Sequence, residues 1–188
     1  MKFYIKYFLE NHASCLLTVI LLVNGCSSIP NKSFPELKVV PYVDIERYLG
    51  KWYEIALYPN WFEKGCFRST AFYEKLENGQ IKVTNQCHMN APDGKLNKAT
   101  GIASIADTKT NAKLKVQFFW PFKGDYWIIG LDEDYQYAIV SEPDRQYLWI
   151  LNAIWENGTK LPCIQIGLKR DVFAQPHFMK SWKTVKSR

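Results

Sequence analysis

Gly50-Lys51-Trp52-Tyr53-Glu54-Ile55-Ala56-Leu57-Tyr58 has the composition of a β-strand and sets the expectation for the rest of the chain. Its aromatic and β-branched residues favour extended backbone, and Gly50 permits a sharp turn after a short helix predicted over residues 43–49. Alternate residues of a strand point to one face. One face of this strand therefore carries a mixed polar and apolar set: Trp52, Glu54, Ala56 and Tyr58. Such a set suits the lining of a cavity, although an ordinary strand of a β-sandwich is the alternative.

Seven further strands are predicted at short spacing, over residues 69–76, 80–87, 98–106, 114–120, 126–131, 135–141 and 146–151. Asn78-Gly79 separates the second from the third and is typical of a two-residue hairpin turn. Eight antiparallel strands fit either a sandwich or an up-and-down barrel. Closure into a barrel removes exposed sheet edges and leaves room for one small ligand.

The motif G-x-W-Y-E-I-A at residues 50–56, followed by Phe62-Glu63-Lys64-Gly65, resembles the opening signature of the lipocalins. Residues 41–151 are similar in order and spacing to bacterial outer-membrane lipocalins and their apolipoprotein D-like relatives. This resemblance favours the barrel over the sandwich. It implies an all-β fold, an eight-stranded antiparallel up-and-down barrel with a short N-terminal helix and a C-terminal helix or tail that has diverged.

The C-terminal part departs from the family pattern. Lipocalins of this kind usually follow the last strand with Ser-Arg or Ala-Arg, and the Arg packs across the Trp of the first strand. This chain has Asn152-Ala153 there, and residues 164–174 show only a weak helical period that is broken by Gly167. We expect the barrel over residues 39–160 and a helix or tail over residues 161–188.

The N-terminus has the form of a secretory signal over residues 1–25, with Lys2 and Lys6 ahead of an apolar run. That run is too short to span a bilayer, which needs about 20 residues. Gly25-Cys26 resembles a bacterial lipobox, which implies lipidation of Cys26; an ordinary cleaved signal is the alternative. Ser27 is similar to lipoproteins sent to the outer membrane, facing the periplasm. Residues 26–38 are expected to form an extended tether.

Composition argues for binding rather than catalysis. The formal charge of the 188 residues is +6 and dispersed, which does not predict nucleic-acid binding, whereas 15% aromatic residues suit a pocket or a membrane surface. His88 and His177 belong to no recognisable catalytic arrangement. No metal-ligand motif or phosphate-binding loop occurs in the sequence. We expect no enzyme activity, no metal and no cofactor.

Three cysteines remain beyond the signal and Cys26, namely Cys66, Cys87 and Cys163. An exported chain meets oxidising conditions, so a disulfide is expected. Cys66 and Cys87 lie at neighbouring strand ends, but the predicted turn sets residue 87 opposite residue 70, so this pairing needs a diagonal reach or a bulge. The competing pair, Cys66 with Cys163, is similar to relatives that tie the first loop to the C-terminal segment. We favour Cys66 with Cys87.

The resemblance to apolipoprotein D-like proteins implies a pocket lined by Tyr73, Asn85, Phe118, Tyr126 and Trp149. Alternation adds their neighbours on the same face. With the first strand, the full set of expected ligand-binding residues is Trp52, Glu54, Tyr58, Ala71, Tyr73, Val83, Asn85, Val116, Phe118, Tyr126, Ile128, Trp149 and Leu151. Glu54 either pairs with a polar neighbour or contacts the polar head of a ligand. The first loop, residues 59–68, carries aromatic side chains that could cover the mouth.

The implied function is storage or transport of a fatty acid or lysophospholipid by a monomer or homodimer that a lipid anchors to the outer membrane. Two alternatives belong to other classes. Some lipocalins are isomerases with a thiol near the position of Cys66, and a disulfide there would remove that thiol. A tethered structural or interaction protein with an atrophied pocket is the other.

Overall fold

A computed structural model describes residues 35–154 and 164–165 of the 188. The predicted signal, the lipidation site Cys26, Cys163 and the predicted C-terminal helix lie outside these residues. No helix among the described residues is both long and apolar enough to cross a bilayer.

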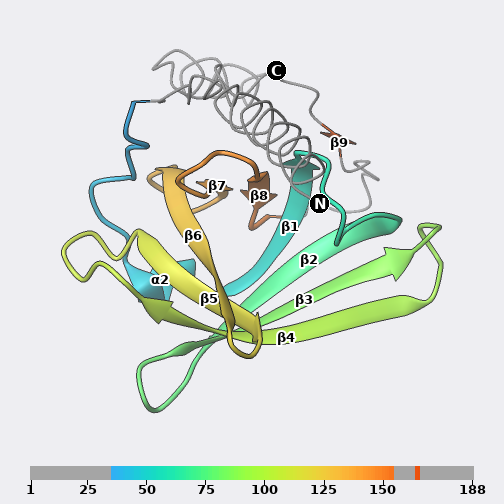
Figure 1. Ribbon diagram of the computed structural model, residues 1–188, viewed down its shortest axis with the longest axis horizontal. Helices are drawn as coiled ribbons and strands as arrows, with labels where there is room; N and C mark the ends of the chain where they lie inside the picture. The colour runs from blue at the N-terminus through green and yellow to red at the C-terminus, as the bar shows by residue number, and fades with distance from the viewer. Residues whose placement is uncertain (1–34, 155–163, 166–188) are drawn as a thin grey trace, which may run out of the picture. The chain divides into compact units, whose positions relative to one another are not determined.

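The described chain forms one short helix and a sheet that closes on itself (Figure 1). The elements are α2 (Ile45–Tyr48), β1 (Gly50–Leu57), β2 (Cys66–Lys75), β3 (Ile81–Met89), β4 (Leu96–Ile105), β5 (Lys113–Phe119), β6 (Phe122–Leu131), β7 (Tyr137–Ser141), β8 (Leu148–Asn152) and β9 (Ile164–Gln165). Strands β1 to β8 pair antiparallel in sequence order, and β8 returns to pair with β1. The eight-stranded antiparallel barrel is therefore confirmed. The two-residue β9 adds a parallel pairing to β1.

The hairpin at Asn78-Gly79 is longer than predicted. Leu76 N donates to Gln80 O at 2.8 Å, which leaves a three-residue loop in which Gly79 has a positive φ of 79°. This is the familiar hairpin in which a left-handed residue ends the loop. The register shifts by one, so Thr70 faces Gln86 and not residue 87.

Strand β1 contains a bulge that the sequence analysis did not predict. Glu54 pairs with Leu151 but Ala56 pairs with Ile150, so Ile55 is the extra residue. A bulge reverses the side-chain alternation beyond it. Trp52 accordingly lies in the cluster inside the barrel, whereas Ala56 and Tyr58 lie in a second cluster with Ile139, Leu148 and Ile150. The prediction that Ala56 and Tyr58 share the face of Trp52 is wrong.

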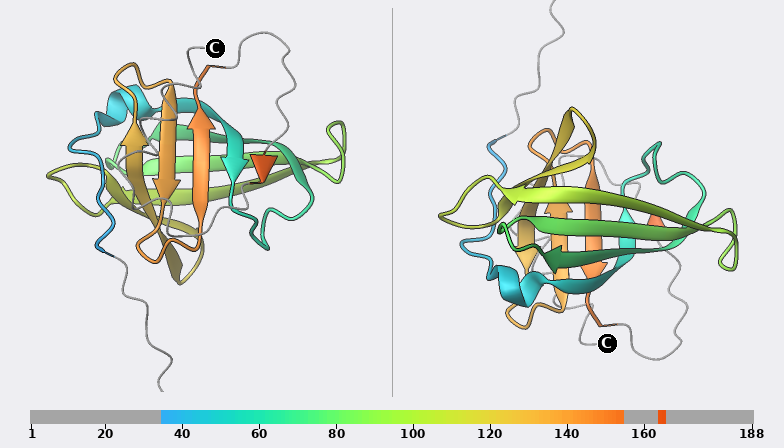
Figure 2. Two further views of the ribbon diagram at one scale, coloured as in Figure 1. Left: turned by 90° about the horizontal axis from the view of Figure 1, so that it is seen from above. Right: turned by 90° about the horizontal axis from the view of Figure 1, so that it is seen from below.

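The barrel has two unlike ends (Figure 2). We call the end that carries α2 and the β2–β3, β4–β5 and β6–β7 connections the closed end, and the other, with the β1–β2, β3–β4, β5–β6 and β7–β8 connections, the open end.

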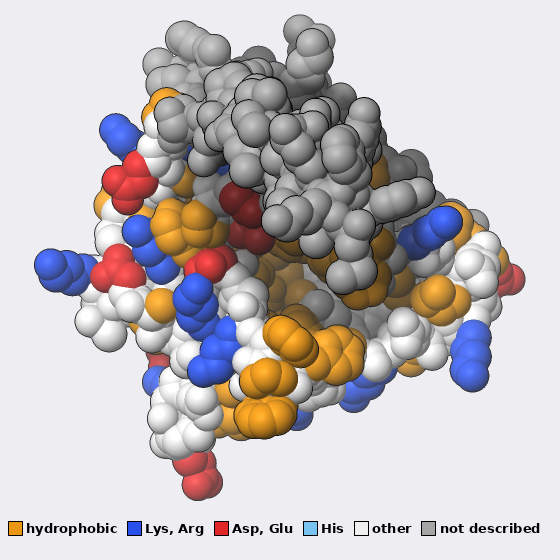
Figure 3. Space-filling model, in the orientation of Figure 1, with side chains coloured by type: hydrophobic (Ala, Val, Ile, Leu, Met, Phe, Trp, Pro, Cys, Tyr) orange, Lys and Arg blue, Asp and Glu red, His pale blue; other side chains and the backbone are white. Residues whose placement is uncertain are grey.

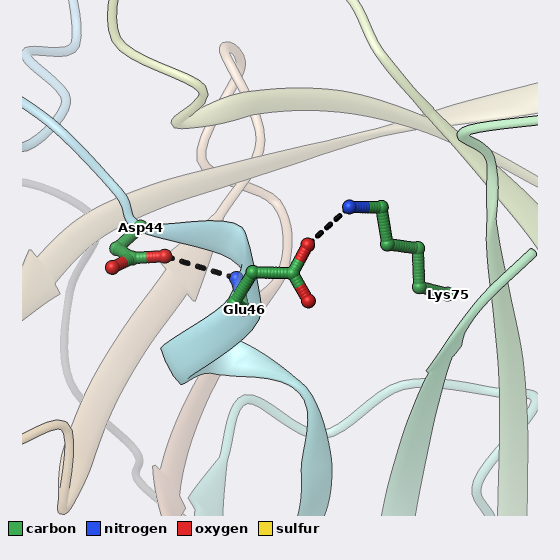
Figure 4. Close-up of polar contacts among 3 residues, drawn as sticks. All are labelled: Asp44, Glu46 and Lys75. Atoms are coloured by element: carbon green, nitrogen blue, oxygen red, sulfur yellow. Dashed lines mark hydrogen bonds and ion pairs between the residues drawn. The ribbon is translucent and has the colours of Figure 1, made fainter.

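Helix α2 is fixed to the closed end by polar contacts. The Asp44 carboxylate accepts from the backbone N–H of Glu46, and the Glu46 carboxylate forms an ion pair with Lys75 of β2 (Figure 4). Asp44 N also donates to the hydroxyl of Tyr135 at 2.8 Å, and Val43 N donates to Thr110 O at 2.8 Å. A side-chain acceptor at the N-cap satisfies an N–H that one helical turn leaves without a partner.

Candidate functional site

A small pocket lies inside the barrel next to the closed end, with a free volume of about 10 Å³. Helix α2 and strands β2 to β6 supply its walls. The lining residues are Ile45, Tyr48, Leu49, Tyr73, Ile81, Ala103, Leu114, Val116, Tyr126 and Ile128. Apart from three tyrosine hydroxyls, these side chains offer hydrocarbon and aromatic ring.

The three tyrosine hydroxyls form a chain. The Tyr126 hydroxyl lies 2.9 Å from that of Tyr48 and 2.8 Å from that of Tyr73. Burial raises the pKa of all three phenols, so each stays neutral at physiological pH. The charge of Glu54 adds to the raised pKa of Tyr73. The three hydroxyls thus bond one another, and the surface that faces the pocket is apolar.

Trp52 closes the interior next to the three hydrogen-bonded tyrosines. Its ring is 1% exposed and stacks on Tyr48 with centroids 4.8 Å apart, and its Nε1 donates to Tyr48 O at 2.9 Å. This protein lacks the Arg that usually packs across the Trp of the first strand in relatives, and Tyr48 packs against Trp52 here. Asn152, which stands at the end of β8, instead accepts from the backbone N–H of Ile154.

The predicted ligand-binding residues divide into groups. Four line the pocket: Tyr73, Val116, Tyr126 and Ile128. Six more belong to or pack against the same apolar cluster: Trp52, Ala71, Val83, Phe118, Trp149 and Leu151. Tyr58 belongs to the second cluster, on the other side of the bulge. Asn85 is half-buried on β3, and its buried Oδ1 meets no hydrogen-bond donor in the described part of the chain.

Sequence reasoning missed six lining residues: Ile45, Tyr48, Leu49, Ile81, Ala103 and Leu114. Three of them could have been found, because alternation places Ile81 with Val83, Leu114 with Val116, and Ala103 within a predicted strand. The helix residues carried no such signal. A four-residue helix is too short for a periodic pattern to reveal which face it buries.

The first loop partly covers the open end. Phe62 contacts the rings of Tyr147 and Trp149 at centroid distances of 5.3 and 6.4 Å, and Trp149 Nε1 donates to the Glu63 carboxylate at 3.2 Å. Phe62 is itself 46% exposed, and Trp61 and Phe67, expected in the same lid, are exposed as well. The mouth is therefore narrowed by one aromatic side chain of this loop.

Cys66 and Cys87 form a disulfide, which confirms the favoured pairing. A bulge between Phe67 and Thr70 brings Cys66 opposite Met89, and the bond reaches diagonally to Cys87. Cys66 consequently has no free thiol for isomerase chemistry. Among the described residues, no three His, Cys, Asp or Glu side chains gather as metal ligands would.

Comparison with known proteins finds relatives along most of the chain. The lipocalin-like domain profile matches residues 43–153. The outer membrane lipoprotein Blc of Escherichia coli K12 is 39% identical over 158 residues, which cover 84% of this chain and 83% of that protein. Apolipoprotein D of Rattus norvegicus is 36% identical over 153 residues, with 74% and 78% covered. The solved structure of insecticyanin from Manduca sexta is 19% identical and superposes with a TM-score of 0.53, over 81% of this chain and 80% of that one. At this identity the likeness supports the fold alone.

Proposed function

The chain belongs to the lipocalin family, and we propose that it binds and stores or transports a fatty acid or lysophospholipid inside its barrel. The observation that carries this proposal is the interior pocket, whose exposed walls are apolar. Sites for small amphiphiles are mostly apolar with a few placed polar groups, and the buried amide oxygen of Asn85 is the polar group that this interior offers. Containment requires no reaction, so we propose a carrier and not an enzyme.

The acyl chain would supply most of the affinity. Burial is worth about 0.8 kcal/mol per CH₂, so a 16-carbon chain gains of order 10 kcal/mol before the cost of ordering it. The polar head needs partners, and Asn85 offers an amide whose buried Oδ1 can accept from a glycerol hydroxyl. Asn85 lies further from the closed end than the pocket, since Ile81 at the start of β3 lines the pocket. This order favours a ligand with its tail at the closed end and its head toward the mouth.

We further propose that lipid on Cys26 anchors the mature protein to the outer membrane, facing the periplasm. Support comes from the lipobox-like Gly25-Cys26 and from relatives named outer membrane lipoproteins in Escherichia coli, Citrobacter freundii and Vibrio cholerae. Radioactive palmitate should label the wild-type chain and not the Cys26→Ala variant. Equal labelling of both would remove the anchor from the proposal.

Ligand binding is tested with two adjacent substitutions on β5. Val116 lines the pocket, whereas Gln117 is the next residue and points to the other face. A fluorescent fatty acid should bind mature, unlipidated protein and be displaced by lysophospholipid. Val116→Asp should abolish binding because an unpaired buried charge costs several kcal/mol, and Gln117→Asp should bind normally.

A third variant guards against misfolding. Val116→Phe keeps the site apolar but fills it, so binding should weaken while the circular dichroism spectrum stays β-rich. If wild type binds no acyl ligand, or if all three variants bind like wild type, the carrier function is wrong and a tethered protein with an atrophied pocket is the better account. Mass spectrometry of lipids extracted from protein purified from its own host would identify the ligand.

A further inference from the structure

The tip of the β5–β6 hairpin is an exposed aromatic surface. Phe119, Trp120 and Phe122 are 76%, 87% and 77% exposed, and Phe119 pairs with Phe122 across the turn. Single exposed apolar residues are normal on a protein surface, but a contiguous set on one protruding tip indicates an interaction site. Figure 3 shows hydrophobic side chains gathered where this hairpin turns, with basic side chains beside them.

Other exposed groups share the end of the barrel with this tip. Trp61, in the β1–β2 connection, is 80% exposed. Lys64 in the same connection and Lys123 next to Phe122 are also exposed. Both views in Figure 2 show the hairpin tip and the β1–β2 connection extending away from α2, at the open end. Trp and Phe with neighbouring Lys form the side-chain set that partitions into the interface of a bilayer with anionic lipid.

The described chain also begins at the open end. Arg145, in the β7–β8 connection, donates to Pro35 O, and the chain then descends the barrel wall, where Val40 N donates to Ile128 O at 3.0 Å. Leu37 is buried in this segment, so the packed part of the chain starts before residue 39, where the barrel was predicted to begin. Nine peptide units separate Cys26 from Pro35, and at 3.3–3.6 Å per residue they reach about 30 Å at most. A lipid on Cys26 would hold the open end within that distance of the bilayer.

We propose that the open end docks on the phospholipid bilayer, with Phe119, Trp120 and Phe122 inserted among the lipid headgroups and Trp61 as a second contact. This inference rests on the proposed lipidation of Cys26. Lys64 and Lys123 would face lipid phosphates. The mouth of the barrel then opens toward the membrane, and an acyl ligand passes between pocket and bilayer with little exposure to water. A protruding tip suits insertion into a soft surface better than a second copy of the chain, since a stable protein interface needs about 800 Å² per partner.

The test uses the mature, lipidated protein in vesicles of phosphatidylethanolamine and phosphatidylglycerol, some of whose acyl chains carry bromine near the headgroup. Bromine quenches Trp fluorescence only at close range, so wild type should be quenched. Trp120→Phe should lose the larger part of this quenching because Phe still docks but does not fluoresce. Trp127→Phe should keep it, since Trp127 lies under Lys113 toward the closed end, with 4.1 Å from Nζ to the ring centroid.

A charge at the tip separates insertion from mere tethering. Phe122→Asp should reduce the quenching of Trp120 to background while the lipid anchor is intact, whereas Gln117→Asp, on the same hairpin, should leave quenching unchanged. Equal quenching in wild type and Trp120→Phe would overturn the proposal. Protection of Trp120 from acrylamide quenching provides a second test. If this protection depends on protein concentration and not on vesicles, a second copy of the chain covers the tip and the proposal is overturned. Trp120→Phe should bind fluorescent fatty acid as wild type does, so a failure of docking is distinguishable from a failure of ligand binding.

Discussion

The closed and open ends of the barrel use the same residue types in opposite ways. At the closed end, Trp52 is 1% exposed, and each tyrosine hydroxyl of the Tyr48–Tyr126–Tyr73 chain has a hydrogen-bond partner. At the open end, Trp61 and Trp120 are 80% and 87% exposed. Aromatic rings bury large areas and carry a polar group that needs a partner when buried. The closed end therefore serves stability and the floor of the pocket, whereas the open end presents its rings to something outside the barrel.

Removing one aromatic ring from each end tests this difference with the largest expected effect. Trp52→Ala should lower the free energy of unfolding by about 3–5 kcal/mol, because it leaves a cavity in the packed interior. Trp61→Ala should change it by no more than about 0.5 kcal/mol, as for most surface substitutions. Urea denaturation of the unlipidated mature protein measures both. Similar losses for the two variants would mean that the ends do not differ in the way described.

The Cys66–Cys87 disulfide stabilises the open end from within the sheet, where β2 begins and β3 ends. It encloses a sequence separation of 21 residues, and a loop of that size corresponds to about 3 kcal/mol of lost chain entropy in the unfolded state. The Cys66→Ser, Cys87→Ser double variant should lose about that much stability. Amide hydrogen exchange should accelerate near residues 66–70 and 86–89 and stay slow around Trp52. Acceleration throughout the barrel would argue against a local role.

Much of this architecture could be predicted from sequence, and the exceptions share one physical origin. Strand positions followed from alternation and turn residues, and the G-x-W-Y-E-I-A motif favoured a barrel over a sandwich. Register was the weak point. The extra residue at Ile55 reverses the alternation and moves Tyr58 to another cluster, and the three-residue loop at Gly79 shifts Thr70 from residue 87 to Gln86. A bulge depends on pairing between distant strands, and local sequence carries little trace of it.

The candidate site shows the same division. Tyr73, Val116 and Ile128, which strand alternation places on the inner face, line the pocket. Tyr48 was not foreseen, because its position depends on how a four-residue helix meets the barrel. Packing between elements decides such contacts.

Breaking the tyrosine chain tests the closed end more finely. Tyr126→Phe removes the hydroxyl that Tyr48 and Tyr73 share and leaves both without that partner. Loss of a partner for a buried polar group costs about 1–3 kcal/mol, so the free energy of unfolding should fall by that amount. Tyr42→Phe is the matched control, since Tyr42 is exposed and the change should stay within about 0.5 kcal/mol. If Tyr126→Phe is as stable as wild type, the hydroxyl chain contributes little to the closed end.

The smallest expected effect is a pH dependence at the open end. Burial, together with a hydrogen bond and repulsion from Asp144, raises the pKa of Glu142 in the β7–β8 connection to about 7 from a usual 4.5. The folded chain therefore binds more protons than the unfolded chain between pH 4.5 and 7. The free energy of unfolding falls as pH rises through this window and levels off above it.

Since Glu142 is only half-buried, solvent screening keeps this change smaller than those above. The three phenols at the closed end stay neutral throughout this window, because burial raises their pKa values. Urea denaturation at several pH values should show a decline for wild type, a weaker one for Asp144→Asn, which removes the repelling charge, and the weakest for Glu142→Gln, which cannot ionise. Identical pH profiles for wild type and Glu142→Gln would mean that other groups cause the pH dependence of the free energy of unfolding. Glu142 would then not distinguish the open end from the closed end.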